Sequence, residues 1–404
     1  MIEIKGKFNT AKVFVEDIDE LTYEQVEKLV NQEFTKDSVI RIMPDCHAGI
    51  GCVIGTTMTI TDKVVPNLVG VDIGCGLLVV ELGKEDLNPI KLDEFILDNI
   101  PYGFDVNSKV LDDSIDLSEL RCFDELKNIN YLRRSVGSLG SGNHFIEVDI
   151  DNEGNKYLVI HSGSRNLGTQ VAEYYQRAAV RYHENKVFNI EEEKQKLINE
   201  LKGTNHQNQI EKELRRLSRK KIEIPIPRDL AYLEGELLDD YLHDMNICQK
   251  YASKNREIMA RRIVDHLNRD FDNLNHFETV HNYINFDDMI LRKGAISANL
   301  GERVIIPINM RDGCIIGFGK GNKDYNMSAP HGAGRLMSRR EAFRTVDLKE
   351  FQKSMEGIYS TSVVKATLDE APSVYKPIEF ILDRIQDTIE VEKIIKPIYN
   401  FKGR

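Results

Sequence analysis

The chain has 404 residues, of which 41% are hydrophobic and 29% charged, a composition typical of a globular protein with a sizeable core. Lys plus Arg is 54 and Asp plus Glu is 65, so the net charge of −11 argues against a protein that coats or packages nucleic acid. An enzyme with one basic groove stays compatible with this balance. The longest apolar stretches, such as residues 76–80, are far shorter than the ~20 residues of a membrane helix. The N-terminal sequence MIEIKGKFNTAK lacks the apolar region of a secretion signal, so we expect a cytoplasmic protein with no membrane partner.

The first half of the chain is dominated by short β-like segments broken by glycine. They occupy residues 51–60, 77–82, 145–150 and 157–160. Apolar residues then recur every three or four positions between Leu167 and Tyr182, which predicts an amphipathic helix.

Residues 183–222 are charged and poor in glycine, and we expect them to form a helical hairpin inserted into the domain. Its turn is expected at Gly203 and Asn205, and Pro225 and Pro227 end its second helix. That second helix carries a basic stretch of six residues: Lys212, Arg215, Arg216, Arg219, Lys220 and Lys221. Two interpretations are open, an RNA clamp and an ordinary solvated helix.

Helical patterns resume over residues 229–245 and 248–271, and glycine-rich strand and loop sequence returns over residues 282–334. Glycine-rich sequence thus lies on both sides of the helical insertion. The predicted fold class is therefore α+β. We expect one large domain, residues 1–404, of mixed sheets and helices around a central metal and nucleotide cleft, with the hairpin inserted into it.

Five of the ten histidines lie in loops rich in glycine, serine or asparagine, where the backbone can approach a ligand. These are His47, His144, His161, His281 and His331. The other five lie in charged, helical sequence, where histidine is ordinary.

The sequence VGVDIGCG places Asp72 and Cys75 three positions apart on a glycine-rich turn. With only six cysteines in the chain, a disulfide framework is not expected, and a reduced cysteine beside acids and histidines is a candidate metal ligand. Thiolate, imidazole and carboxylate together suit a divalent ion, and zinc, manganese, iron and cobalt all stay open. Glycine loops around such a site favour a catalytic ion over a structural one.

Three further loops offer unhindered backbone N–H groups for anions, at residues 140–143, 161–165 and 331–335. Two of them end in arginine, Arg165 and Arg335, each near an expected helix start, and Arg339 follows one turn later. None has the spacing of a P-loop. Loops that combine glycine, histidine and arginine in this way indicate a site for phosphate and metal together.

Taken together, these motifs resemble those of one family, the RNA-splicing ligase RtcB family. The matching sequences follow in family order from residue 44 to residue 403: PDCHAGIGCVIG, GVDIGCG, GSGNHFIE, HSGSRNLG, HNYIN, RKGA, SAPHGAGRLMSR, APSVYK and FKG. The resemblance covers nearly the whole chain. It implies an enzyme with two Mn²⁺ ions that uses GTP to join RNA 3′-phosphate or 2′,3′-cyclic phosphate ends to 5′-hydroxyl ends through a GMP-histidine intermediate, in RNA repair or tRNA splicing.

The resemblance also implies roles for individual residues. His331 would be the nucleophile that carries GMP. One Mn²⁺ would be held by Asp72, Cys75 and His144, and the other by Cys75, His161 and His281. Nucleotide contacts would come from Asn143, Glu147, Asn282, Tyr375 and Lys402. Binding of RNA or phosphate groups would involve Arg165, Lys293, Arg335 and Arg339, and Asp45 would serve the same phosphate and metal region.

One segment departs from the family pattern. Residues 307–313 read PINMRDG where many members carry a small-residue loop like PGSMG, so nucleotide contacts are expected to differ there.

Two other functions compete with the ligase. A metal-dependent phosphodiesterase or an RNA 3′-end guanylyl-capping enzyme would use the same site without joining strands, and an RNA-binding scaffold would use no chemistry at all. The presence of His331, Tyr375 and Lys402 favours an enzyme that uses guanylate, because a hydrolase needs no guanine pocket. The sequence leaves open which RNA is joined, the oligomeric state, and whether turnover needs an accessory protein such as archease.

Overall fold

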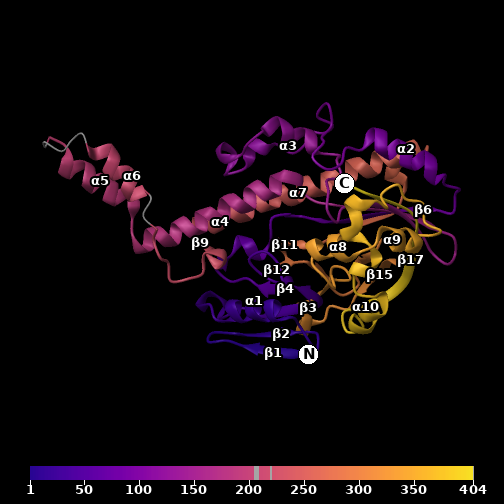
Figure 1. The fold of residues 1–404 in the computed structure, drawn as a ribbon, viewed down its shortest axis with the longest axis horizontal. Coiled ribbons are helices and arrows are strands. Elements are labelled where there is room, and N and C mark those ends of the chain that lie inside the picture. The colour runs from indigo at the N-terminus through magenta and orange to yellow at the C-terminus, as the bar shows by residue number, and fades with distance from the viewer. Residues whose placement is uncertain (204–208, 219–220, 404) are drawn as a thin grey trace.

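The computed structural model describes residues 1–203, 209–218 and 221–403. Its strands form two large sheets (Figure 1). The first has six strands in the order β1-β2-β3-β4-β12-β11. Their bounds are Ile2–Lys5, Thr10–Val13, Ile40–His47, Ile54–Thr59, Ile290–Lys293 and Asn282–Asn285. Only β2 and β3 run parallel among these neighbours, and helix α1 (Glu20–Val30) packs its buried Val26, Leu29 and Val30 against the sheet.

The second sheet has seven strands in the order β10-β6-β8-β7-β17-β15-β14. Their bounds are His276–Val280, Gly76–Gly83, Lys156–Ser162, Phe145–Ile150, Ile389–Lys402, Gly313–Gly319 and Arg303–Asn309. This sheet curls until its two edge strands meet, and the N–H of Ile305 on β14 donates to Thr279 Oγ1 on β10 at 3.2 Å. The curl gives the sheet an inner face, which carries Leu77, Val79, Val159 and Ile316 in one core cluster.

The outer face of the seven-stranded sheet lies under helices. Leu78, Val80, Leu158 and Ile160 alternate with the inner-face residues, as the period of two along a strand requires. They pack against α7 (Glu236–His266) through residues such as Ile263 and against α2 (Pro89–Asn99). Both faces are therefore buried, which explains strands as continuously apolar as GLLVV in β6.

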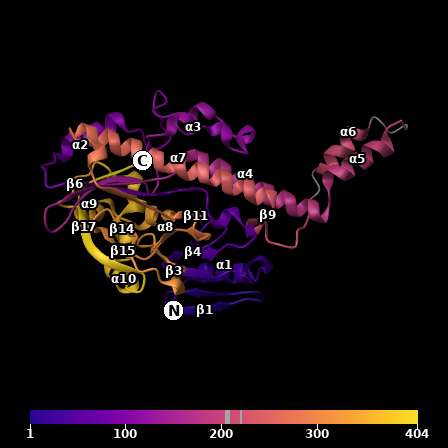
Figure 2. The ribbon, with the colours of Figure 1, turned by 180° about the vertical axis from the view of Figure 1, so that it is seen from behind.

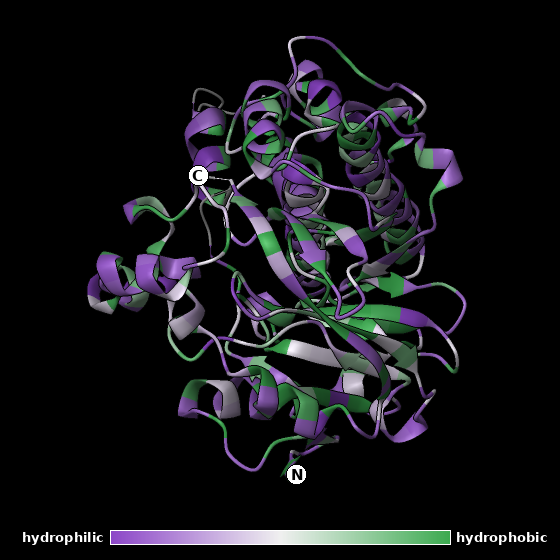
Figure 3. Ribbon diagram, turned by 90° about the vertical axis from the view of Figure 1, so that its right-hand side faces the viewer, coloured by the Kyte–Doolittle hydropathy of each residue, from purple (hydrophilic) through white to green (hydrophobic). Residues whose placement is uncertain are grey.

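The remaining elements are short. Two-stranded sheets pair β13 (Ala295–Ser297) with β16 (Ser328–Pro330) and β5 (Lys63–Val64) with β9 (Leu233–Glu234). Helices α3 (Ile129–Ser135), α8 (Arg339–Thr345), α9 (Leu348–Ser354) and α10 (Ile378–Arg384) lie on the surface of the domain, and 3₁₀ turns connect several elements. Apolar residues gather in the interior strands, and hydrophilic residues cover the outer helices (Figure 3). None of the described helices combines the length and apolarity needed to cross a bilayer.

The α+β prediction is confirmed, and the four predicted β-like segments become β4, β6, β7 and β8. The helix expected from Leu167 is α4 (Arg165–Val187). The prediction of the helices was wrong in two respects. Residues 229–245 and 248–271 were predicted as separate helices, but one continuous helix, α7, spans Glu236–His266, because no glycine or proline interrupts its buried stripe. The N-terminal part also holds α1 and α2, which the sequence analysis missed although Asp19 and Asn88 cap their first turns.

The predicted hairpin consists of α5 (Ile190–Leu201) and α6 (Ile210–Ser218), which pack on each other and project from the end of α4 (Figures 1 and 2). Gly203 has φ +79° at the turn. Asn205, Arg219 and Lys220 lie outside the described residues. Helix α5 has no buried residue, and the described residues of the hairpin contribute no side chain to the core clusters of the body.

We expect the body to fold without the hairpin. Replacing residues 189–221 by a flexible linker of about six residues should leave the melting temperature within a few degrees of the parent, because no core contact is lost. Calorimetry checks this. A large fall in the melting temperature would show that the hairpin stabilises the body.

Candidate active site

Four neighbouring strands bring four predicted metal ligands to one end of the curled sheet. Cys75 directly precedes β6, His144 directly precedes β7, His161 lies near the end of β8 and His281 directly follows β10. The register aligns them, since His161 lies opposite both Leu77 and Phe145. Antiparallel pairing thus gathers side chains that are up to 206 positions apart in the sequence.

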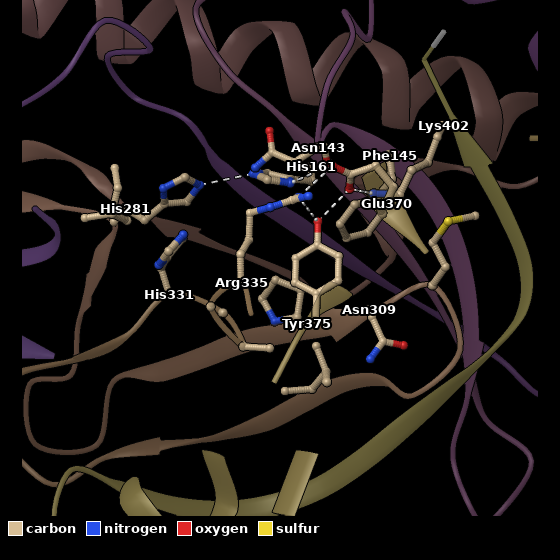
Figure 4. Close-up of a pocket in the computed structure, with 18 of the residues that line it drawn as sticks. Asn143, Phe145, His161, His281, Asn309, His331, Arg335, Glu370, Tyr375 and Lys402 are labelled. Carbon is tan, nitrogen blue, oxygen red and sulfur yellow. Dashed lines mark hydrogen bonds and ion pairs between the residues drawn. The ribbon is translucent and has the colours of Figure 1, made fainter. Parts of the chain in front are cut away.

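Their distances define two groups that share the Cys75 sulfur. Cys75 Sγ lies 3.4 Å from the Nε2 atoms of both His144 and His161. On one side, His144 Nε2 lies 3.1 Å from Asp72 Oδ2. On the other, His161 Nε2 lies 3.1 Å from His281 Nε2, as the dashed line in Figure 4 marks. The residues of the two predicted ligand sets therefore lie in two contiguous clusters with Cys75 between them.

The hydrogen bonds of these ligands leave their Nε2 atoms free for a metal ion. His144 Nδ1 donates to the Leu139 carbonyl at 2.9 Å, and His161 Nδ1 donates to the Asn143 carbonyl at 3.2 Å. These bonds select the tautomer whose Nε2 lone pair faces the cluster. Asp72 Oδ1 is buried without a hydrogen-bond partner among the described residues. An unpaired carboxylate oxygen beside unprotonated imidazole nitrogens fits a divalent cation.

The protonation state of the cluster also fits a bound divalent cation. Burial holds the pKa of His161 and of His281 well below the usual value, so both imidazoles are neutral. Burial and the neighbouring Asp72 carboxylate raise the pKa of the Cys75 thiol well above its ordinary value. A thiolate at this position therefore requires a bound cation. A donor set of one thiolate, three imidazoles and one carboxylate supplies what such an ion needs.

Two buried polar residues of α7 hold the loops behind these ligands, and the sequence analysis missed both. Arg256 Nη1 donates to the carbonyls of Gly74 and Ser162, each at 2.8 Å, next to Cys75 and His161 in the chain. Asn255 accepts the N–H groups of Gly137 and Ser138 at 2.8 and 3.0 Å. Their signal in the sequence is an Asn-Arg pair within the apolar stripe of α7.

His331 directly follows β16 and is held by Asp45, which lies on β3 of the six-stranded sheet. His331 Nδ1 donates to Asp45 Oδ2 at 2.7 Å, and the same oxygen accepts the backbone N–H groups of His331 and Gly332. Asp45 is fully buried. Gly334 packs so tightly on Asp45 that a Cβ there would lie 2.4 Å from the Asp45 carbonyl oxygen. Asp45 therefore holds the His331 ring in a fixed orientation.

A cavity of about 260 Å³ connects His331 to the predicted nucleotide residues (Figure 4). His161 and His281 line it near the metal cluster, and the His281 and His331 rings lie 4.9 Å apart between centroids. The predicted nucleotide residues also line it: Asn143, Glu147, Asn282, Tyr375 and Lys402. One cavity therefore joins the metal cluster, the candidate nucleophile and the candidate base pocket.

The far end of the cavity is organised by Glu370, which the sequence analysis did not single out. Its buried carboxylate accepts from Tyr375 OH at 2.7 Å and from Lys402 Nζ at 2.6 Å, and Arg335 Nη1 lies 3.4 Å away. The neighbouring Asp369 pairs with Arg339 at 3.0 Å. The two acids directly precede the motif APSVYK, and this position in the sequence could have indicated them as site residues.

Asn282 and Glu147 have partners that fix their side chains at the cavity wall. Asn282 Oδ1 accepts the Gly294 N–H at 2.9 Å. Glu147 accepts from Asn400 Nδ2 at 2.6 Å, and burial raises its pKa above the usual value. Below it on the inner face of the curled sheet lies Asp149, whose pKa is raised by burial and by the Glu147 charge.

Two predicted RNA-binding residues do not line the cavity. Lys293 Nζ donates to the carbonyls of Ile50 and Asn67 at 2.7 and 2.8 Å, and burial lowers its pKa. Arg165 donates to Ser138 Oγ and to the Gly103 carbonyl at 3.0 and 2.8 Å. Within the described part of the chain, neither cation has a carboxylate at ion-pair distance.

The departure at residues 307–313 is a closed turn at the cavity wall. Asn309 Oδ1 accepts the N–H groups of Arg311 and Asp312 at 3.0 and 2.9 Å, and Asn309 Nδ2 donates to Asp312 Oδ2 at 2.8 Å. Met310 is buried beneath it. The asparagine side chain is therefore engaged by its own turn.

The chain is similar to known proteins over nearly its whole length. A family model described as tRNA-splicing ligase RtcB matches residues 25–131 and 123–403. The RNA-splicing ligase RtcB of Escherichia coli (strain K12) is 28% identical over 402 residues, with 90% of each chain covered. The tRNA-splicing ligase RtcB of Methanococcus maripaludis is also 28% identical, with 96% of this chain and 94% of the relative covered. The chain belongs to the RtcB family.

Proposed function

We propose that this protein is an RNA ligase that joins a 3′-phosphate or 2′,3′-cyclic phosphate end to a 5′-hydroxyl end, with GTP as the energy source. The observation that carries the proposal is the single cavity in which His331, held by Asp45, lies between the metal cluster and the Tyr375 pocket. A phosphodiesterase needs neither a histidine nucleophile nor a base pocket.

His331 is arranged to attack phosphorus through Nε2. Asp45 holds the proton on Nδ1, so the Nε2 lone pair is available and the charge that forms on the imidazole during attack is stabilised. Attack on the α-phosphorus of GTP forms an N–P bond and releases pyrophosphate. The resulting GMP-histidine has a labile P–N bond, which suits a group that must be transferred again.

Two transfers then complete the reaction. An oxygen of the RNA 3′-phosphate attacks the α-phosphorus, the N–P bond breaks, and His331 is restored while GMP passes to the RNA end. The 5′-hydroxyl then attacks the 3′-phosphorus, loses its proton, and expels GMP. A 2′,3′-cyclic phosphate is first opened by water to give the 3′-phosphate.

Metal ions at the cluster would be held by the ligand sets that the structure brings together. Asp72, Cys75 and His144 would hold one Mn²⁺, and Cys75, His161 and His281 would hold the other. Bound there, two cations neutralise the phosphate charge and polarise the phosphorus that is attacked. The unpaired Asp72 oxygen and the neutral imidazoles support this assignment.

The far end of the cavity supports guanine recognition. The Tyr375 ring would stack on the base and Lys402 would contact its edge, with Glu370 holding both side chains in place. Asn143, Asn282 and Glu147 would contact the rest of the nucleotide from the cavity wall. Arg335 and Arg339 would bind phosphate groups in the cavity. Arg165 and Lys293, which do not line it, would bind RNA.

The first test is a pulse and chase with α-labelled GTP and Mn²⁺, followed by RNA with 3′-phosphate and 5′-hydroxyl ends. We expect a labelled protein band whose GMP is released as joined RNA appears. A band without joining would identify an end-capping enzyme or a missing partner, and no band would favour a phosphodiesterase.

His331→Ala should abolish the labelled band, because the imidazole proposed to form the N–P bond is removed. Asp45→Asn should slow band formation by roughly 10²-fold or more, because the amide no longer holds the Nδ1 proton or stabilises the imidazolium. The exposed His276, on the same sheet as the ligands, provides a control, and His276→Ala should label normally. A labelled band in His331→Ala would place the nucleophile elsewhere.

Cys75→Ala should lose both ions together, because one sulfur lies in both ligand sets. Metal analysis after dialysis should find about two manganese ions per wild-type chain and less than one in the variant. Cys122→Ala removes another buried thiol and should retain both ions. Retention of one ion by Cys75→Ala would refute the shared ligand.

A further inference from the structure

One large apolar side chain is exposed to solvent beside residues 139–143, the segment that leads into His144 and is called the metal loop below. Phe104 is 90% exposed, the largest exposed fraction among the large hydrophobic residues of the described chain. A phenylalanine normally gains ~2–3 kcal/mol from burial, so such exposure of a well-anchored residue needs an explanation. Its neighbour Tyr102 does find an apolar partner and packs edge-on against Phe401 at 5.3 Å.

The exposure of Phe104 does not come from a loose loop. The Pro101 and Gly140 carbonyls each take part in a 2.8 Å hydrogen bond, with the N–H groups of Leu139 and Gly103 respectively. The Phe104 carbonyl accepts from Tyr131 OH at 2.9 Å. The backbone is thus fixed on both sides of the ring. Residues 101–103 run along the segment that leads into the ligand His144.

Arg165, one of the predicted RNA-binding residues, contacts the same segment of the chain. Its Nη2 donates to the Gly103 carbonyl, one residue from Phe104, at 2.8 Å. Its Nη1 lies so close over Gly140 that a Cβ there would be 2.1 Å away. No described carboxylate pairs with this guanidinium at ion-pair distance. An unpaired cation and a fixed, exposed aromatic ring therefore lie together at the edge of the metal loop.

We propose that Phe104 is a stacking platform for one base of the RNA strand, next to the nucleotide whose phosphate Arg165 binds. This inference rests on the proposed RNA ligase function and extends it to a base-binding position outside the cavity. Aromatic rings and arginine cations beside them are the usual means of holding single-stranded nucleic acid. Because every base has a π-face, such a platform holds an end close to the reacting groups without selecting its sequence.

The test measures the affinity of the full-length protein for a fluorescent single-stranded RNA with a 3′-phosphate. Phe104→Ala should weaken binding by about tenfold, and Phe104→Trp should restore it, because stacking needs only an aromatic face. Both variants should keep the wild-type melting temperature, since the ring has no buried contact. Phe286, a second exposed phenylalanine at the far end of β11 from Asn282, provides the matched control, and Phe286→Ala should bind normally.

A series of RNAs, each with one abasic nucleotide at a different position, tests the contact between Phe104 and a base. In wild type, one abasic position close to the RNA end should weaken binding about as much as Phe104→Ala does. The Phe104→Ala variant should bind this abasic RNA as tightly as it binds the intact RNA. Equal affinity of Phe104→Ala and wild type, or losses that add at every position, would overturn the platform even when the wild-type protein ligates RNA. A wild-type protein that neither binds this RNA nor forms the GMP adduct would overturn the ligase proposal together with the platform.

Discussion

The buried cluster of electron-pair donors around Cys75 is the constraint on which the rest of the structure depends. One thiol, three imidazoles and the Asp72 carboxylate meet where four strands end, and their own hydrogen bonds do not satisfy them. Such a cluster is costly to bury without a cation. The curled sheet is what makes the cluster possible, because antiparallel register fixes the ends of β6, β7, β8 and β10 at one edge.

Helix α7 completes this arrangement from behind. Arg256 is fully buried, pairs with Glu278 at 3.1 Å, and binds the carbonyls that flank two ligands. Its charge also lowers the pKa of the Cys75 thiol, against the larger effects of burial and Asp72. Asn255 and Arg256 are adjacent on this helix, and together they bind three loops from one rigid element.

The sequence predicts the local parts of the site better than the long-range ones. Cys75, His144 and His161 are recognisable because each lies in a glycine-rich motif at the end of a strand, where local sequence fixes the backbone. His281 is recognisable because it lies beside Asn282 in the motif HNYIN, directly after β10. The partnership of Asp45 with His331 joins residues 286 positions apart and two different sheets, so no spacing reveals it. Glu370, Asn255 and Arg256 were missed for the same reason. Their roles come from tertiary contacts, and an acid or an arginine in a helix is ordinary by itself.

The position of His331 would let one histidine act with the metal cluster, the nucleotide and the RNA in the proposed reaction. It stands where the six-stranded sheet, through Asp45, meets the metal cluster of the curled sheet, and its ring lies 4.9 Å from that of His281. In the proposed reaction the guanine base lies toward Tyr375 and Glu370, whereas Arg165 and Phe104 lie beside the metal loop. Nucleotide and RNA then approach the histidine from different sides. In that arrangement only the α-phosphorus would change partners when GMP passes from His331 to the RNA end, and the base would stay beside Tyr375.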